Sequence, residues 1–495
     1  MSKNDEIKPS EKQISSLLQF YNNGDNTNAE KLAVLLTQNF PNHNLGWKVL
    51  ASLYKAQGDL SRSLEANQKS IEINPLDAEA YNNLANSMLA LNDEKEAEKY
   101  YKKAIEVNPR NEQMHSNLGK LFVSQDRFDE AELSYKESIN LNSDNAPTFA
   151  LLGEMLEHVG RTNEAEENFK KAIAIDPKHP DYHVSLGLVE RIYGRVKDAD
   201  ASYRKALVLD PKNTHANYHL GIMLFEKGQY KEAASHFNLT NEAHSKSFEL
   251  KCYYLQGEQL KFYEKLDKLI KEGKTDAVIG SLSCRSEIRY GIKKTNPFCN
   301  DPLKYLLKAD LTERYDFKNI FIEEVKNILN EDGLSTKSQS LITNGYQTSG
   351  NLFKRETAAI KKIKDIIHLE INSYRSFYKN SNEGFITKWP EKYSLHGWII
   401  SLKNGGQLSS HMHDNGWLSG SIYINIPKKS KSDSGNLVVR IDDEKYPIKG
   451  NNQSESIDIV TGSMCLFPSS LLHHTIPFES EEERIVLAFD VLKPN

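Results

Sequence analysis

A repeated interval of 34 residues is the feature that most constrains how this chain can fold. Residues with a ring recur at this interval, at Trp47, Tyr81, His115, Phe149 and His183. Three residues after each comes a leucine, at Leu50, Leu84, Leu118, Leu152 and Leu186. The next position is always small, with Ala51, Ala85, Gly119, Gly153 and Gly187. Small residues let two helices approach closely, so each interval predicts a packed helix pair that stacks on its neighbours.

The second half of each interval carries a matching pattern. Another small position recurs at Ala97, Ala131, Ala165, Ala199 and Ala233, and an aromatic ring follows at Tyr101, Tyr135, Phe169, Tyr203 and Phe237. Prolines at Pro75, Pro109, Pro177 and Pro211 close the second helix, because proline cannot donate to the helical ladder. This order of residues resembles the tetratricopeptide repeat (TPR). The resemblance implies a superhelix whose concave groove binds a protein or peptide partner, the alternative being an array that only spaces or dimerises the chain.

The repeats are expected to end well before the C-terminus. We count six good units over residues 44–243, preceded by a degenerate repeat or cap over residues 1–43. Residues 244–295 keep helical periodicity and are predicted to form a helical cap and linker. A loop of turn-forming residues around 294–302 then marks the start of a second domain, predicted over residues 296–495.

Composition narrows the class of protein further. A chain of 495 residues exceeds what one hydrophobic core supports, so at least two packed regions are expected. The net charge of -5 argues against a surface that binds nucleic-acid phosphates. No stretch approaches the roughly 18 apolar residues of a membrane span, and residues 1–13 lack the apolar core of a signal peptide. The four cysteines are scattered without CxxC spacing, which favours a cytoplasmic location.

Short alternating runs broken by Gly, Asn, Asp and Pro follow Trp389 and predict antiparallel strands. The predicted strands cover residues 395–403, 408–413, 418–426, 436–441, 456–459, 464–467 and 484–491. Helical periodicity over residues 317–329 and 354–378 predicts helices that cover this sheet. The predicted fold class is therefore an α solenoid, the TPR superhelix, followed by an α+β domain with a jelly-roll barrel (double-stranded β-helix) and covering helices.

Two of these strands are predicted to share a polar inner face. Alternation places Ser419, Ser421, Tyr423 and Asn425 on one side of their strand, and Arg484, Val486, Ala488 and Asp490 on one side of the last strand. The opposite sides are apolar and are expected to meet the helices. Buried polar groups need partners, so this interior predicts an enclosed ligand.

Histidines supply the densest chemistry of the second domain. His411 and His413 lie two residues apart and are predicted to project to the same strand face, which suits two ligands on one metal. A third ligand is available from His473 or His474 at the start of a later strand, and Arg484 follows His473 by 11 residues. We interpret His396 as structural, His474 as pointing away from His473 to the surface or to the back of the ligands, and Trp398 and Trp417 as wall or core residues.

Together these features resemble the Fe(II)/2-oxoglutarate-dependent oxygenases, including those fused to TPRs. The resemblance implies that His411, His413 and His473 bind Fe(II), leaving open positions for 2-oxoglutarate and O2 as co-substrates. It further implies that Arg484 and Tyr423 bind the far carboxylate of 2-oxoglutarate, which suits the planar fork of arginine.

One position departs from the usual family pattern. The common strand motif is His-x-Asp or His-x-Glu, whereas this chain has His411-x-His413. Two alternatives follow: three histidines form the site, or Asp414 turns inward at a bulge and supplies the carboxylate.

Three functions remain open from the sequence. The first is a 2-oxoglutarate-dependent dioxygenase that hydroxylates a protein or peptide held by the repeats. The second is a non-catalytic TPR adaptor with a degenerate barrel. The third is an oxygenase that acts on a small molecule or glycan, with the repeats only assembling a complex. Retention of Arg484, Tyr423 and both strand histidines favours catalysis.

Overall fold

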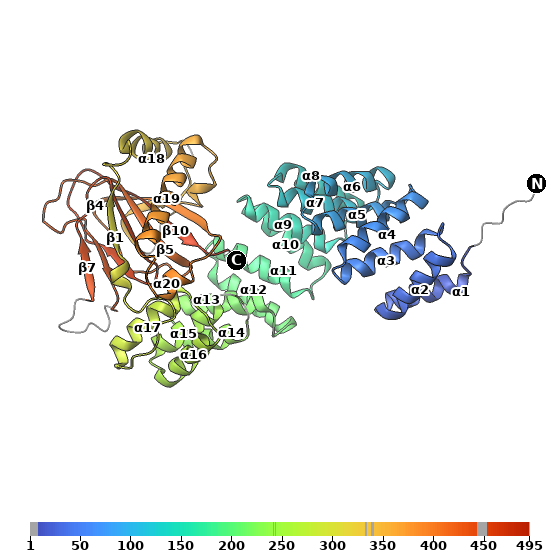
Figure 1. The fold of residues 1–495 in the computed structure, drawn as a ribbon, viewed down its shortest axis with the longest axis horizontal. Helices are drawn as coiled ribbons and strands as arrows, with labels where there is room; N and C mark the ends of the chain where they lie inside the picture. The colour runs from blue at the N-terminus through green and yellow to red at the C-terminus, as the bar shows by residue number, and fades with distance from the viewer. Residues whose placement is uncertain are drawn as a thin grey trace, which may run out of the picture. The chain divides into compact units, whose positions relative to one another are not determined.

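The structure is a computed structural model that describes residues 8–240, 242, 244–331, 334–337, 341–442 and 453–494. The outermost ends of the predicted regions, residues 1–7 and 495, and the predicted repeat end at residue 243 lie outside the described residues. The chain divides into two compact units, Met1–Ala216 and Asn217–Asn495. Figure 1 labels many of the helices and strands of the two units.

The first unit consists of consecutive antiparallel helix pairs. Its helices are α1 (Glu11–Asn22), α2 (Asn26–Asn39), α3 (Asn44–Ala56), α4 (Leu60–Ile73), α5 (Ala78–Ala90), α6 (Glu94–Val107), α7 (Glu112–Ser124), α8 (Phe128–Leu141), α9 (Ala146–His158), α10 (Thr162–Ile175), α11 (Pro180–Ile192) and α12 (Val196–Leu209). Many begin at an Asp or Asn whose side chain accepts from a backbone N–H of the first turn, as Asp59 and Asp93 do. Between the paired helices, Gly58 and Gly160 adopt a left-handed conformation that favours glycine.

The predicted close approach within each repeat is present. A Cβ added at Gly153 would lie 2.8 Å from Cε1 of Phe169, and one at Gly187 would lie 2.7 Å from Cε1 of Tyr203. The rings of the second helix therefore occupy the space that the small residues leave on the first. The repeats are confirmed as a TPR-type solenoid, and their spacing follows from this packing.

The second unit begins with further helices. They are α13 (Thr214–Glu226, which starts before the division), α14 (Tyr230–Asn238), α15 (Ser245–Gln256), α16 (Gln259–Lys271) and α17 (Ala277–Tyr290). Leu250, Tyr254, Phe262, Leu266 and Ile279 form one apolar cluster across α15, α16 and α17. We call these three helices the cap helices.

Two antiparallel sheets follow the cap helices. The strands are β1 (Leu307–Asp310), β2 (Thr336–Lys337), β3 (Ile342–Thr348), β4 (Ser394–Leu408), β5 (Gly416–Asn425), β6 (Leu437–Arg440), β7 (Ser454–Ile457), β8 (Ser463–Pro468), β9 (Leu472–Thr475) and β10 (Arg484–Leu492). Seven form a sheet in the order β1-β8-β5-β10-β4-β3-β2, and three form a sheet in the order β7-β6-β9. We call this part of the unit the sheet domain.

The large sheet separates two apolar layers. On one face, Ile363 and Ile367 of α19 (Ala358–Phe377) share a core with Leu487 and Phe489 of β10. On the other face, Tyr423 and Val486 pack with Leu437 and Val439 of the small sheet. The shorter helices are α18 (Glu323–Leu329), which follows a π-helical turn, and α20 (Gly384–Thr387). The predicted fold class, a repeat solenoid followed by a sheet domain with covering helices, is confirmed, and its two facing sheets are compatible with a jelly roll.

One predicted strand is wrong. Residues 409–413 are not part of a regular strand, because β4 ends at Leu408 and only His411 forms an isolated bridge, to His473. Strands β1, β2 and β3 were not predicted, since they lie before Trp389 among segments without clear alternation. Within the described residues, no helix has the length and apolar character that crossing a membrane requires.

Candidate functional site

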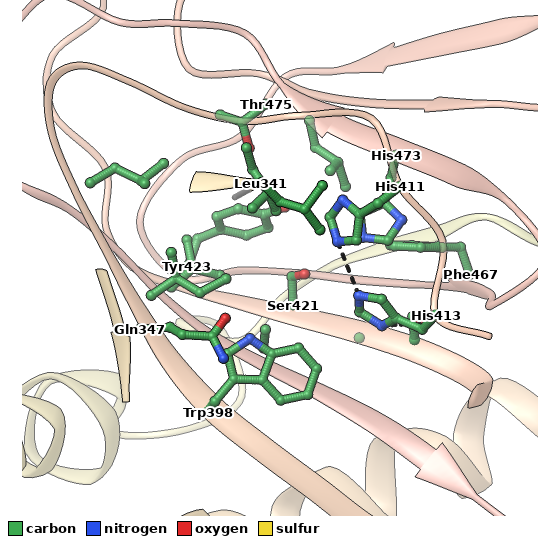
Figure 2. Close-up of a pocket in the computed structure, with 18 of the residues that line it drawn as sticks. Leu341, Gln347, Trp398, His411, His413, Ser421, Tyr423, Phe467, His473 and Thr475 are labelled. Carbon is green, nitrogen blue, oxygen red and sulfur yellow. Dashed lines mark hydrogen bonds between the residues drawn. The ribbon is translucent and has the colours of Figure 1, made fainter. Parts of the chain in front are cut away.

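A cavity of about 310 Å³ lies between the two sheets of the sheet domain. Its lining includes Gln347 of β3, Trp398 of β4, Tyr423 of β5, His473 of β9 and Arg484 of β10. Figure 2 shows the histidines grouped on one side, with Gln347 and Trp398 on another. Its volume is at the small end of the range for ligand sites in proteins.

Strand register brings the polar residues to this cavity. Three pairs lie opposite one another on β5 and β10: Ser419 with Asp490, Ser421 with Ala488, and Tyr423 with Val486. Because opposite residues in an antiparallel pair share a face, their side chains point to the same side. Ser419, Ser421, Tyr423 and Arg484 all line the cavity, as the alternation predicts. Asn425 does not line it, and its Nδ2 instead donates to the backbone oxygen of Glu483 at 2.6 Å.

Three histidines converge at one side of the cavity. The backbone N–H groups of His411 and His473 donate to each other's carbonyl oxygens at 3.1 and 2.8 Å, which ties the loop after β4 to β9. The ligand atoms of His411, His413 and His473 lie within 4.8 Å of one another. The Nε2 atoms of His411 and His413 are 3.2 Å apart, as the dashed line in Figure 2 marks. Two ligand nitrogens about 2.1 Å from a shared metal would have a similar separation, roughly 3.0–3.4 Å.

The contacts of the three Nδ1 atoms explain how the imidazole rings are oriented. The Nδ1 of His413 lies 2.6 Å from Oδ1 of Asp490, and the Nδ1 of His411 lies 2.8 Å from the backbone oxygen of Ser409. The Nδ1 of His473 lies 3.4 Å from the backbone oxygen of Leu471. All three partners are acceptors, so each Nδ1 carries a hydrogen, and in the neutral form of each ring the lone pair lies on Nε2. This arrangement typically supports histidines that bind a metal.

Electrostatics favour the neutral form of two of these rings. Burial, followed by the neighbouring His413, lowers the pKa of His411 to about 4. Burial and the adjacent histidines hold the pKa of His473 well below its usual value. Burial alone would lower the pKa of His413, but the Asp490 carboxylate more than offsets it, and the pKa is raised. The donor set is therefore two neutral imidazoles and one that Asp490 polarises.

Asp490 is a residue of the histidine site to which the sequence assigned no role. Its Oδ1 accepts from the Ser419 hydroxyl at 2.8 Å as well as from His413, and Ser419 in turn lies 2.8 Å from the Ser469 hydroxyl. The alternation on β10 places Asp490 on the same face of the strand as Arg484, and this alternation is the signal that the sequence offers. Nothing in the spacing links it to His413, which is 77 residues away.

Arg484 contributes a buried cation to the cavity. The residue is 3% exposed, and its Nε makes no hydrogen bond within the part of the chain that the structure describes. Its guanidinium carbon lies 5.3 Å from the ring centroid of Tyr423, which is also buried. Burial lowers the pKa of Arg484, and Tyr423 partly offsets this effect. A buried guanidinium without an acid partner is costly, so an anion bound in the cavity would stabilise it.

The remaining predicted residues lie in different places. Asp414 does not join the histidine group, because both of its carboxylate oxygens contact Nζ of Lys251, at 2.8 and 3.1 Å. His396 and Trp398 line the cavity, whereas His474 does not. Trp417 is a core residue whose Nε1 donates to the backbone oxygen of Phe385 at 3.0 Å.

A pocket with three converging imidazoles and a buried arginine is typical of a metal-dependent enzyme that binds an anionic ligand. Comparison with known families agrees. Residues 396–490 match the family described as "Putative 2OG-Fe(II) oxygenase". Residues 4–144 match the EMC2 TPR-like repeat domain, and residues 146–179 and 193–246 match tetratricopeptide repeats. The chain therefore joins tetratricopeptide repeats to a C-terminal region of the 2OG-Fe(II) oxygenase family, as the sequence motifs indicate.

Solved structures resemble the chain only in part. MamA is 22% identical with a TM-score of 0.31, over 33% of this chain and 95% of that one. PilF of Pseudomonas aeruginosa is 19% identical with a TM-score of 0.36, over 39% of this chain and 90% of that one. Cut9 with Hcn1, from the APC/C, is 15% identical with a TM-score of 0.41, over 48% of each chain. No match was found among curated proteins.

Proposed function

We propose that this protein is a 2-oxoglutarate-dependent dioxygenase that hydroxylates a protein or peptide recruited by its repeats. In this proposal His411, His413 and His473 bind Fe(II), and Arg484 and Tyr423 bind 2-oxoglutarate. The observation that carries it is the convergence of ligand nitrogens from three histidines, each of which has an acceptor on its Nδ1. Fe(II) and 2-oxoglutarate would supply the activation of O2 that lets the site oxidise a C–H bond.

The histidine set fits a divalent first-row metal. Imidazole suits iron, and two of the three rings need no deprotonation near neutral pH because burial lowers their pKa values. Asp414 is held by Lys251, which supports the three-histidine alternative over a site completed by Asp414. The negative charge that a carboxylate ligand would bring lies instead behind His413, on Asp490.

The arginine fits the co-substrate. A guanidinium binds a carboxylate through two parallel N–H donors, and Arg484 is buried with an unused Nε. Tyr423 lies beside it with a hydroxyl that burial keeps protonated, since its pKa is raised. Both residues line the same cavity as the histidines, so one molecule would reach the metal and Arg484 together. The pocket thereby explains a buried charge that packing alone does not.

The repeats provide a surface suited to a peptide. A groove of about 870 Å³ in the first unit is lined by six asparagines, Asn74, Asn82, Asn83, Asn86, Asn108 and Asn111. Carboxamides both donate and accept, as the backbone of an extended peptide requires. This groove supports recruitment of a protein or peptide rather than a repeat array that serves only as a spacer.

The cysteines support a reducing cytoplasmic location. Cys252, Cys284, Cys299 and Cys465 are all free and buried. Disulfides are rare in reducing compartments, where buried thiols are stable.

The proposal is tested by loading the protein with Fe(II) without oxygen and then supplying O2 and 2-oxoglutarate. We expect about one Fe(II) per chain and slow release of succinate even without a substrate. The variant with His411, His413 and His473 all changed to Ala should bind no iron and release no succinate. Equal iron content in the two proteins would refute the site and leave the adaptor function in its place.

A further inference from the structure

Asp414, the residue after His413, forms an ion pair with a residue of the cap helices. Asp414 accepts from Nζ of Lys251, which lies on α15, at 2.8 and 3.1 Å. The two side chains are 19% and 24% exposed, so the pair is largely shielded from water. Lys251 and Asp414 lie 163 residues apart in the chain but within the same compact unit.

The residue between the two histidines has a second anchor. Met412 packs against the apolar cluster of the cap helices, which includes Leu250, Tyr254 and Leu282. It also contacts the core that α19 shares with the large sheet. The two residues that flank His413 therefore both contact the cap helices or their core.

Lys251 is itself fixed in position. Its Nζ lies 5.5 Å from the ring centroid of Phe225 on α13 and 5.6 Å from that of Phe248 on α15. The two rings pack edge-on with their centroids 5.5 Å apart. The ammonium group thus bridges the last helix pair of the repeats and the loop that carries His411 and His413.

We propose that α15 positions the histidine loop through Lys251 and Met412, and that Asp414 is the anchor of this loop rather than a metal ligand. The inference rests on the proposed metal site. A metal centre needs its ligands held within about 0.5 Å of their binding positions, and residues 409–415 have no strand pairing of their own beyond the bridge at His411. Without the anchor the loop would sample more conformations, and metal binding would have to order it.

Two measurements on the full-length chain test this role. The first is amide hydrogen exchange of residues 409–416 in metal-free protein, which does not depend on any metal. The second is the affinity for Fe(II), titrated without oxygen. In Lys251→Met, exchange in this loop should become at least several-fold faster, and Fe(II) should bind about 10-fold more weakly, as when an outer partner of a ligand is lost.

The matched control is Lys246→Met. Lys246 also lies on α15 and pairs with Glu272 near the protein surface, so this variant removes an ion pair of the same helix without leaving a buried charge unpaired. Its loop exchange and Fe(II) affinity should equal those of the wild type. The double variant Lys251→Asp with Asp414→Lys reverses the pair and should recover part of the lost affinity, which a folding defect would not allow.

The outcomes are separable. Unchanged loop exchange in Lys251→Met would overturn the anchor, whatever the metal result. Faster exchange with unchanged Fe(II) affinity would also overturn it, because the loop would then not limit binding. Failure of the wild type to bind Fe(II) would refute the proposed function instead, and the exchange data would still decide whether Lys251 fixes the loop.

Discussion

The recurring contacts of the repeats and the cavity of the sheet domain are built from different kinds of residue. In the repeats, small residues such as Gly153 and Gly187 are covered by the single rings of Phe169 and Tyr203, and these contacts recur from unit to unit. In the sheet domain, buried positions around the cavity hold His473, Arg484 and other polar groups. Packing accounts for every member of the first set. The second set costs stability unless the buried polar groups find partners, which is why the ligand site is proposed in this cavity.

The largest expected effect is a loss of Fe(II) affinity in a variant of the sheet domain. His473→Ala removes a ring whose Nε2 faces the other two histidines, and Fe(II) affinity should fall more than about 100-fold. Its control is the adjacent His474→Ala, which changes a residue of the same strand that does not line the cavity. Anaerobic titration with Fe(II) measures both. Similar losses in the two variants would mean that strand β9, rather than a ligand, had been damaged.

The next effect concerns the repeats. Gly153→Val places side-chain atoms where Cε1 of Phe169 lies only 2.8 Å from a Cβ, so it should destabilise the first unit by about 1–3 kcal/mol. Chemical unfolding followed by circular dichroism measures this, with the exposed Glu167→Val on α10, the helix that carries Phe169, as the control. Fe(II) affinity should not change. A loss of Fe(II) affinity in Gly153→Val would show that metal binding in the sheet domain depends on the packing of the repeats.

A smaller loss of Fe(II) affinity is expected when Asp490, which contacts Nδ1 of His413, is changed. Asp490→Asn keeps the shape of the side chain but removes the charge that His413 contacts at 2.6 Å. Fe(II) affinity should fall about 10-fold, as is typical when an outer partner of a ligand is lost. The exposed Asp310→Asn, also in the sheet domain, is the control. Unaltered affinity in Asp490→Asn would show that the charge of Asp490 contributes nothing to metal binding through His413.

An effect of similar size is expected on the acid stability of the metal-free protein. Burial lowers the pKa of His411 to about 4 and that of His473 well below its usual value, so both stay neutral in the folded protein as the unfolded chain takes up protons. Above pH ~6.5 these histidines are neutral in both states and do not reduce the free energy of unfolding. As the pH falls from ~6.5 towards the folded-state pKa values, only the unfolded chain takes up protons at these residues, so the free energy of unfolding decreases. His473→Gln should reduce the loss of unfolding free energy between pH 7 and 5 by about 1–2 kcal/mol. Urea unfolding measures this, and His474→Gln should behave as the wild type.

Sequence predicted local features better than distant contacts. The 34-residue period reports helix packing between neighbours, and alternation on β5 and β10 correctly places Tyr423 and Arg484 on one face. The contacts of Asp490 with His413 and of Lys251 with Asp414 join residues 77 and 163 positions apart. No periodicity encodes such pairs, because they depend on how the strands and cap helices meet in three dimensions.

The proposed oxygenase function depends most directly on whether Arg484 binds 2-oxoglutarate beside the metal. Calorimetric titration of the Fe(II)-loaded protein without oxygen tests this, using the wild type, Arg484→Met and, as a control outside the cavity, Arg314→Met. We predict one 2-oxoglutarate per iron in the wild type and in Arg314→Met. Arg484→Met should bind one to three orders of magnitude more weakly, since it loses a charge-assisted bidentate contact of roughly 1.5–4 kcal/mol. Equal affinity in Arg484→Met, or no binding by the loaded wild type, would contradict the oxygenase assignment.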